Sequence, residues 1–171
     1  MSNYILRHDE ANCIGCEACE VHCKTNKGLG PGAKPCKIVS IGPVAVEGRP
    51  RMRFVFMPCF HCEEAWCAKA CPTGAMQRRE KDGIVFVQAS LCVGCKSCIA
   101  ACPWGTPQWD PATRKVVKCD FCMDRIDAGE QPVCVSVCPT NALQFGKPES
   151  ISSATLEAYG YGLLERKLSA A

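Results

Sequence analysis

Four groups of cysteines dominate the sequence, and each of them gathers four thiols in a short stretch. The third group, in LCVGCKSCIAACP, places Cys92, Cys95, Cys98 and Cys102 within eleven residues and ends at Pro103. Three thiolates at such intervals can wrap one iron–sulfur cube, and the fourth then points to a neighbouring cube. The glycine of Cys-x-Gly-Cys lets the backbone approach the cluster. The pattern therefore predicts ligands for 4Fe–4S clusters, whose chemistry is electron transfer.

The other three groups have related spacings. They are Cys13-x2-Cys16-x2-Cys19-x3-Cys23, Cys59-x2-Cys62-x4-Cys67-x3-Cys71 and Cys119-x2-Cys122-x11-Cys134-x3-Cys138. A proline follows the second and fourth groups, as it does the third, and turns the chain away because proline cannot continue a helix. Only Cys36 of the 17 cysteines is left over, and we expect it to be a small buried residue. The groups predict four 4Fe–4S clusters.

Zinc and disulfides are the alternative uses of so many cysteines. Zinc sites usually take two cysteines from each of two hairpins, rather than four from one short stretch. Disulfides usually join distant segments, and the cysteine count is odd. A zinc-binding structural module therefore stays as the alternative from another class of protein.

The first residues and the apolar runs bear on the compartment. Asn3–Leu6 is followed at once by the charged Arg7–Glu10, so the apolar core of a signal peptide is missing. No run approaches the length of a transmembrane helix. We therefore expect a cytoplasmic protein without direct membrane insertion, in a compartment that keeps thiols reduced.

The formal charge of +3 counts every cysteine as neutral. A 4Fe–4S site with four thiolates carries roughly −2 when oxidised, so the loaded chain is net negative. The lysines and arginines then compensate buried negative clusters, and we expect no nucleic-acid partner.

The segment between groups two and three predicts how the groups pair. A short apolar run, the turn Lys81–Gly83 and the strand-like Ile84–Val87 predict a β-hairpin that links these groups into one two-cluster unit. PTNALQFG after Cys138 repeats PTGAMQ after Cys71, so the first and last segments should pair as the equivalent hairpin. Groups one and four then form the other unit. Pairing group one with two and three with four is the alternative.

The two remaining linkers are also predicted to be hairpins. The expected strands are Lys37–Val46 with Arg51–Met57, around Glu47–Pro50, and Thr106–Trp109 with Lys115–Val117, around Asp110–Arg114.

The nested pairing assigns a set of four ligands to each cluster. The sets are Cys13, Cys16 and Cys19 with Cys138; Cys119, Cys122 and Cys134 with Cys23; Cys59, Cys62 and Cys67 with Cys102; and Cys92, Cys95 and Cys98 with Cys71.

The predicted fold class is α+β: tandem ferredoxin-like two-cluster units, rich in loops, with short β-hairpins and short helices. Residues 1–36 and 117–150 form the first unit, and 37–116 form an inserted second unit. Because metal–thiolate bonds replace much of a large hydrophobic core, we expect the apo chain to be largely unfolded.

The C-terminal tail, residues 151–171, lies outside the cysteine repeats. Its leucines suggest a partly helical stretch with two glycine interruptions; the residues concerned are Leu156, Leu163, Leu164, Leu168, Gly160 and Gly162. We expect it to dock onto a partner or onto another copy of the chain, with packing against the body as the alternative.

Several other residues lie close to the cysteines. Every group supplies four thiolates, so His22 and His61 should pack or form hydrogen bonds rather than bind metal. Four lysines near ligands are candidates to raise cluster potentials, with solvated surface side chains as the alternative: Lys24, Lys69, Lys96 and Lys118.

The motifs together resemble a known family. The chain resembles the four-cluster, ferredoxin-like electron-transfer subunits of dimethyl sulfoxide reductase and formate dehydrogenase. The segments that carry this resemblance are the long second and fourth cysteine groups, CPWGTPQWD and KCDFCMDRIDAGEQPVCVSVCP. The resemblance covers Tyr4 to Gly146 and implies the same nested pairing. Nitrate-reductase-like members have tryptophan at the position of Cys95 and a 3Fe–4S cluster, so the cysteine here implies four 4Fe–4S clusters.

The resemblance implies an electron-transfer subunit, not an enzyme in its own right. It would relay electrons between a catalytic metalloenzyme subunit and a second redox subunit or carrier. Among compact members, the chain looks most like polyferredoxin subunits of tungsten aldehyde oxidoreductases, so an aldehyde or formate oxidoreductase with tungsten or molybdenum is the expected partner. Subunits of hydrogenases or carbon monoxide dehydrogenases, and a free polyferredoxin, are the alternatives.

Overall fold

The computed structural model describes residues 2–169, with side chains as far as Leu164. The helices are short except for the last; they are α1 (Ala18–Asn26), α2 (Trp66–Lys69), the 3-10 turn η1 (Ala89–Leu91), α3 (Ser97–Ala101), α4 (Met123–Asp127), α5 (Val133–Ser136) and α6 (Pro148–Ser169). The strands are β1 (Ile5–His8), β2 (Lys37–Val46), β3 (Arg49–Met57), β4 (Met76–Arg78), β5 (Val85–Val87), β6 (Gln108–Asp110), β7 (Lys115–Val117) and β8 (Leu143–Gly146).

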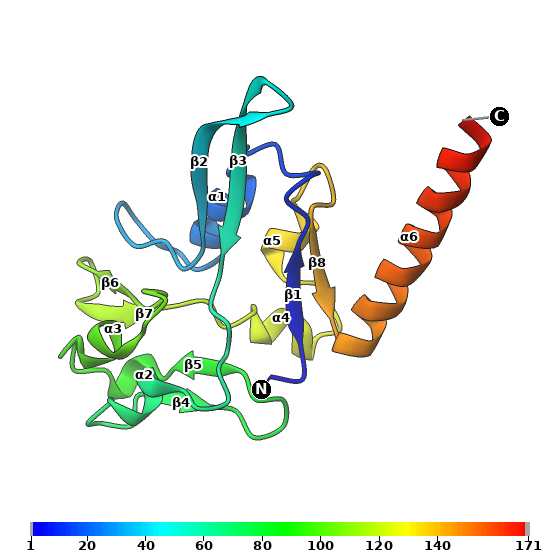
Figure 1. Ribbon diagram of the computed structural model, residues 1–171. Helices are drawn as coiled ribbons and strands as arrows, with labels where there is room; N and C mark the ends of the chain where they lie inside the picture. Colours follow the sequence, from blue (N-terminus) through cyan, green and yellow to red (C-terminus); the bar gives the residue numbers. More distant parts are fainter. Residues whose placement is uncertain (1, 170–171) are drawn as a thin grey trace.

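The strands form four antiparallel pairs: β1 with β8, β2 with β3, β4 with β5, and β6 with β7. The pairing of the first and last strands runs from Ile5 opposite Gly146 to His8 opposite Leu143. All four pairings agree with the predicted ones, with a shift in one strand: β6 begins at Gln108 rather than Thr106, and it includes Asp110, which pairs with Lys115 instead of lying in the loop. Figure 1 shows α2, α3 and β4 to β7 grouped on one side, with β1, β8, α4 and α5 on the other.

The turn of the β2–β3 hairpin is shorter than predicted. We expected Glu47–Pro50 to be the loop, but β3 already begins at Arg49, and Pro50 pairs with Ala45. Glu47 and Gly48 have φ angles of 51° and 74°. Two consecutive residues of positive φ make a tight turn whose twist matches that of the flanking strands, so the strands pair up to the turn.

The core consists of small patches in which cysteines are prominent. One patch joins Cys19, Cys23 and Cys134 to Ile38 and Phe56. The two others gather around the buried β5 region, where Ile84 is 0% and Val85 1% exposed. A core this small leaves much of the stability to whatever holds the cysteines together.

The expectation that glycines interrupt the helix of the C-terminal tail is wrong. The last helix, α6, is one continuous helix of 22 residues that runs through Gly160 and Gly162, because a glycine costs only about 1 kcal/mol in a helix otherwise rich in good helix formers. It also begins earlier than predicted, at Pro148, where a missing backbone donor is harmless.

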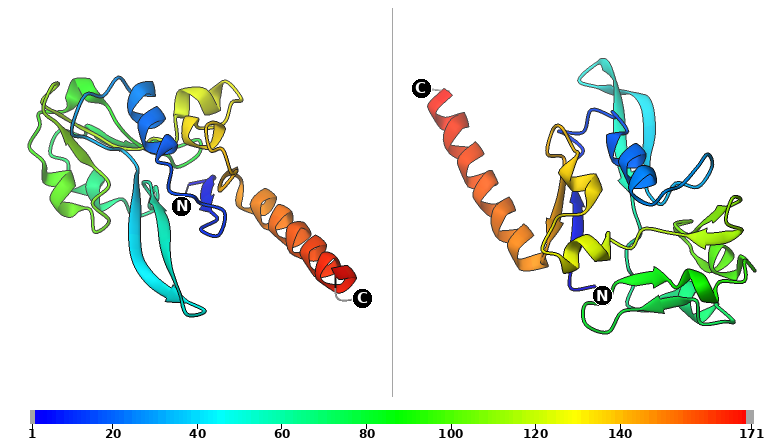
Figure 2. Two further views of the ribbon diagram at one scale, coloured as in Figure 1. Left: turned by 90° about the horizontal axis from the view of Figure 1, so that it is seen from above. Right: turned by 180° about the vertical axis from the view of Figure 1, so that it is seen from behind.

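Most of α6 does not pack against the body, which was the alternative expected for the tail. Ile151 is buried against β8, whereas Leu156 and Leu164 are exposed, and the helix projects away from the other elements (Figures 1 and 2). The side chain of Leu168 and residues 170–171 lie outside the described part. Within residues 2–169, no helix is both long enough and apolar enough to cross a membrane.

Candidate metal centres

The structure brings three of the four predicted ligand sets together, each around its own cavity. We name each set after the group that supplies three of its members. Set I is Cys13, Cys16, Cys19 and Cys138; set II is Cys59, Cys62, Cys67 and Cys102; set III is Cys92, Cys95, Cys98 and Cys71.

The fourth predicted set, set IV, consists of Cys23, Cys119, Cys122 and Cys134, and all four are buried. Burial raises the pKa of Cys134, and the charges of Cys119, Cys122, Cys23 and also Cys19 of set I raise it further. Charges act strongly only over short distances, so Cys134 lies near the other three cysteines of set IV and near set I.

The donor chemistry fits iron–sulfur clusters. None of the 17 cysteines, all of which lie in the described residues, forms a disulfide bond in this structure. No three His, Cys, Asp or Glu side chains among residues 2–164 converge as tightly as one metal ion requires. A 4Fe–4S cluster instead takes one thiolate per iron and spaces the four sulfurs further apart. Sets of four cysteines around a shared cavity match that need.

One backbone position recurs in all four groups. The residue before the second cysteine has positive φ in each: 68° at Gly15, 46° at His61, 71° at Gly94 and 55° at Phe121. This conformation folds the loop so that its cysteines face one point. At Gly94 a Cβ atom would lie 2.8 Å from the Arg114 carbonyl oxygen, so only glycine fits.

Groups two and four have no glycine before their second cysteine. The two residues that take the positive φ angle there were not identified from the sequence. His61 and Phe121 adopt the strained conformation and contact each other. An alignment of the four Cys-x-x-Cys segments with one another could have found them. His61 is 0% exposed, and its Nδ1 accepts a hydrogen bond from the Val85 N–H at 2.9 Å. The predicted packing role of His61 is confirmed.

The sets follow one another in a row. Set I and set IV share the first core patch through Cys19 and Cys134. Cys59 of set II and Cys119 of set IV share another, and Cys67 of set II packs with Cys98 of set III. The order is therefore I, IV, II, III, and the two outer sets hold the two exposed cysteines, Cys16 and Cys95.

The pKa values of the cysteine thiols in the four sets shift in different directions. Burial raises the pKa of Cys19 and of Cys119 to about 12, and that of Cys98 to about 11. At Cys138 and Cys102 burial also acts to raise the pKa, but hydrogen bonds from nearby threonines and backbone amides together outweigh it and lower the pKa of each. Such donors also suit a sulfur that binds a cluster.

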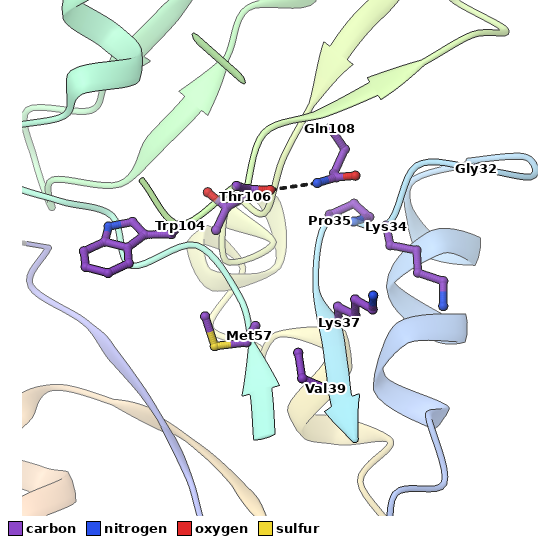
Figure 3. A pocket seen from close by; sticks show the side chains of 10 residues that line it. Gly32, Lys34, Pro35, Lys37, Val39, Met57, Trp104, Thr106 and Gln108 are labelled. Carbon is purple, nitrogen blue, oxygen red and sulfur yellow. Dashed lines mark hydrogen bonds between the residues drawn. The ribbon is translucent and has the colours of Figure 1, made fainter. Parts of the chain in front are cut away.

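A separate open cavity of about 400 Å³ lies beside set II (Figure 3). It shares Trp104 and Thr106 with the set II cavity, and Lys34 and Lys37 line its other side. None of the described residues that line it is a cysteine, so it is not a further ligand set.

The spatial arrangement agrees with comparisons to known proteins. Two family models match, both described as a 4Fe–4S dicluster domain, over residues 12–75 and 50–148. The chain is 45% identical over 148 residues to the thiosulfate reductase electron transfer subunit PhsB of Salmonella typhi, covering 85% of this chain and 77% of that protein.

Two further relatives have similar coverage. The B subunit of polysulfide reductase from Wolinella succinogenes is 42% identical, over 84% of this chain and 75% of its own length. The B subunit of anaerobic dimethyl sulfoxide reductase from Escherichia coli is 40% identical, over 81% of this chain and 70% of its own length. The chain is thus an iron–sulfur electron-transfer subunit of a reductase complex; it carries four 4Fe–4S clusters and is not the catalytic subunit. It belongs to the 4Fe–4S dicluster domain family.

Proposed function

We propose that sets I to IV are the ligands of the four clusters, and that electrons pass along the row I, IV, II, III between a catalytic subunit and a second redox partner. Each cluster, when bound, takes up and returns one electron. The cavities lined by sets I, II and III are the main observation that supports this proposal.

The chain divides, in this proposal, into two nested ferredoxin-like units. Residues 1–36 and 117–150 hold sets I and IV, and residues 37–116 hold sets II and III. The pairing of β1 with β8 and of β4 with β5 supports the division, because each pair closes one unit.

The described residues hold the clusters at different depths. The cysteines of set IV are buried, so they keep water from the middle of the row. The outer sets each expose one cysteine, Cys16 or Cys95, beside an exposed Ile14 or Val93. These two ends are where partners would approach, since electron transfer needs short distances to the donor and acceptor.

We infer that the catalytic partner reduces a sulfur compound. The named relatives serve thiosulfate, polysulfide and dimethyl sulfoxide reductases, and the chain spans most of their length. The narrower expectation of a tungsten aldehyde oxidoreductase has no support among these relatives and stays a prediction. We further propose the cytoplasm as the compartment, to be tested by cell fractionation.

An anaerobic purification of the tagged chain from its native host tests the proposal. We expect about sixteen irons and as many acid-labile sulfides per chain, together with a large co-purifying subunit. The preparation is then assayed with thiosulfate, polysulfide, dimethyl sulfoxide and an aldehyde, using a reduced or oxidised dye.

The outcomes separate the candidate functions. Reduction of a sulfur compound supports the inferred partner, whereas aldehyde oxidation with bound tungsten supports the aldehyde oxidoreductase. Nickel in the partner points to a hydrogenase or carbon monoxide dehydrogenase. Recovery of the fully loaded chain alone favours a free polyferredoxin, and zinc in place of iron refutes the ligand assignment.

A further inference from the structure

Lys118 is a lysine that is buried close to two of the cysteine sets. It is only 4% exposed, and its Nζ donates hydrogen bonds to two backbone carbonyls, that of Cys119 at 2.6 Å and that of Val85. Within residues 2–164, no aspartate or glutamate forms an ion pair with it, whereas the neighbouring Lys27 is paired with Asp120 at 2.6 Å. A buried charge without an opposite charge is costly, so its counter-charge must come from elsewhere.

The surroundings of Lys118 locate that counter-charge between set II and set IV. One carbonyl that it contacts belongs to Cys119 of set IV. The other belongs to Val85, which lines the set II cavity. These two contacts place the Lys118 ammonium group beside both inner sets.

The contacts of Val85 hold the lysine in place. Its carbonyl accepts from Lys118, while its N–H donates to His61, which is itself buried against Phe121. The Lys118 side chain therefore ends at a fixed point between the two inner sets and is screened from water.

We propose that Lys118 is the cation shared by the two inner clusters, and that it raises the reduction potential of both. The inference rests on the proposed ligand assignment. Reduction adds one negative charge to a cluster, and a nearby buried cation stabilises the more negative form. The inner clusters then retain electrons more readily than they would without Lys118, which favours electron transfer between the two units.

Potentiometric titration followed by electron paramagnetic resonance tests this role in the intact complex. Lys118→Met removes the charge, Lys118→Gln removes it but keeps a hydrogen-bond donor, and Lys118→Arg keeps the charge. The matched control is Lys115→Met, three residues earlier, because Lys115 is only half-buried and its Nζ donates a solvent-exposed hydrogen bond to the Ala89 carbonyl oxygen.

We expect two of the four potentials to fall in the neutral variants. At a fixed ambient potential, the ratio of reduced to oxidised inner clusters should drop about tenfold, which is about 59 mV for a one-electron couple. Lys118→Arg should restore most of the shift, and Lys115→Met should cause none. Iron content is measured in every variant, because a wild-type protein without about sixteen irons refutes the proposed function rather than this inference.

Several results would overturn the role of Lys118. Unchanged potentials at full iron content, a shift of one potential alone, or an equal shift of all four would each contradict a charge shared by two clusters. If the neutral variants fail to assemble the inner clusters, retention of these clusters in Lys118→Arg supports the charge, and their loss in that variant as well refutes it.

Discussion

The imidazole ring of His61 lies against the ring of Phe121, with 3.8 Å between their centroids. Each residue occupies the position before the second cysteine of its group, which is glycine in the other two groups. The side chains that replace these glycines fill the space between set II and set IV. The two proposed units are thus joined by their own ligand loops.

Removal of the His61 ring should weaken that junction. His61→Ala leaves a void in a fully buried position and should cost roughly 2–4 kcal/mol. Heating the loaded protein and following the loss of its brown colour measures the effect. His22→Ala, at an exposed position in group one, is the control, and equal bleaching of the two variants would contradict the prediction.

Glycine substitutions should separate backbone strain from steric exclusion. Gly94→Ala places a Cβ atom against Arg114 and Trp109, whereas Gly105→Ala has a similar φ of 64° and open space around it. The strain alone costs roughly 1–2 kcal/mol. We therefore expect Gly94→Ala to lose the set III cluster, about four irons of sixteen, and Gly105→Ala to keep all of them. Iron analysis decides, and equal iron in both variants would show that the contact is harmless.

Cys36 should be dispensable for cluster binding. It is 3% exposed, and its Sγ donates to the Cys19 carbonyl oxygen at 3.7 Å. The contact with Cys23 and burial raise its pKa, which keeps it a neutral thiol. Cys36→Ala should retain the full iron content, whereas Cys134→Ala should lose a cluster. A loss of iron from Cys36→Ala would make it a ligand.

Removal of iron should unfold most of the chain. The core patches contain many of the cysteines themselves, and these thiols no longer converge when the metal is gone. An anaerobic chelator should abolish the near-ultraviolet circular dichroism and expose the body to protease. Retention of the native spectrum without iron would mean that the hydrophobic patches suffice.

Deletion of residues 151–171 should leave the clusters intact and weaken binding to a partner. In the removed segment Ile151 is buried and packs near Gly146 of β8, whereas Leu156, Leu163 and Leu164 are exposed. Iron content and co-purification of the catalytic subunit are measured together. If the truncated chain still forms the complex at full yield, α6 is not a docking segment.

The segments that flank the cysteine groups made the strand pairing predictable, because they repeat one another. The repeat of PTGAMQ in PTNALQFG placed β8 beside β1 without any structural information. The continuity of α6 through Gly160 was not predictable, since a glycine is a weak signal against a long run of helix formers. Lys118 looked like any other lysine near a ligand, because its burial depends on β5, a segment more than thirty residues away.

The pairing of β1 with β8 also sets an order of events during synthesis. β1 leaves the ribosome about 135 residues before β8, and at roughly 5–20 residues per second the delay is about 7–27 seconds. The segment from β4 to β7 contains its own partner strands and can be completed within that interval. A nascent chain that stops before β8 therefore leaves its first strand without the partner that β8 provides.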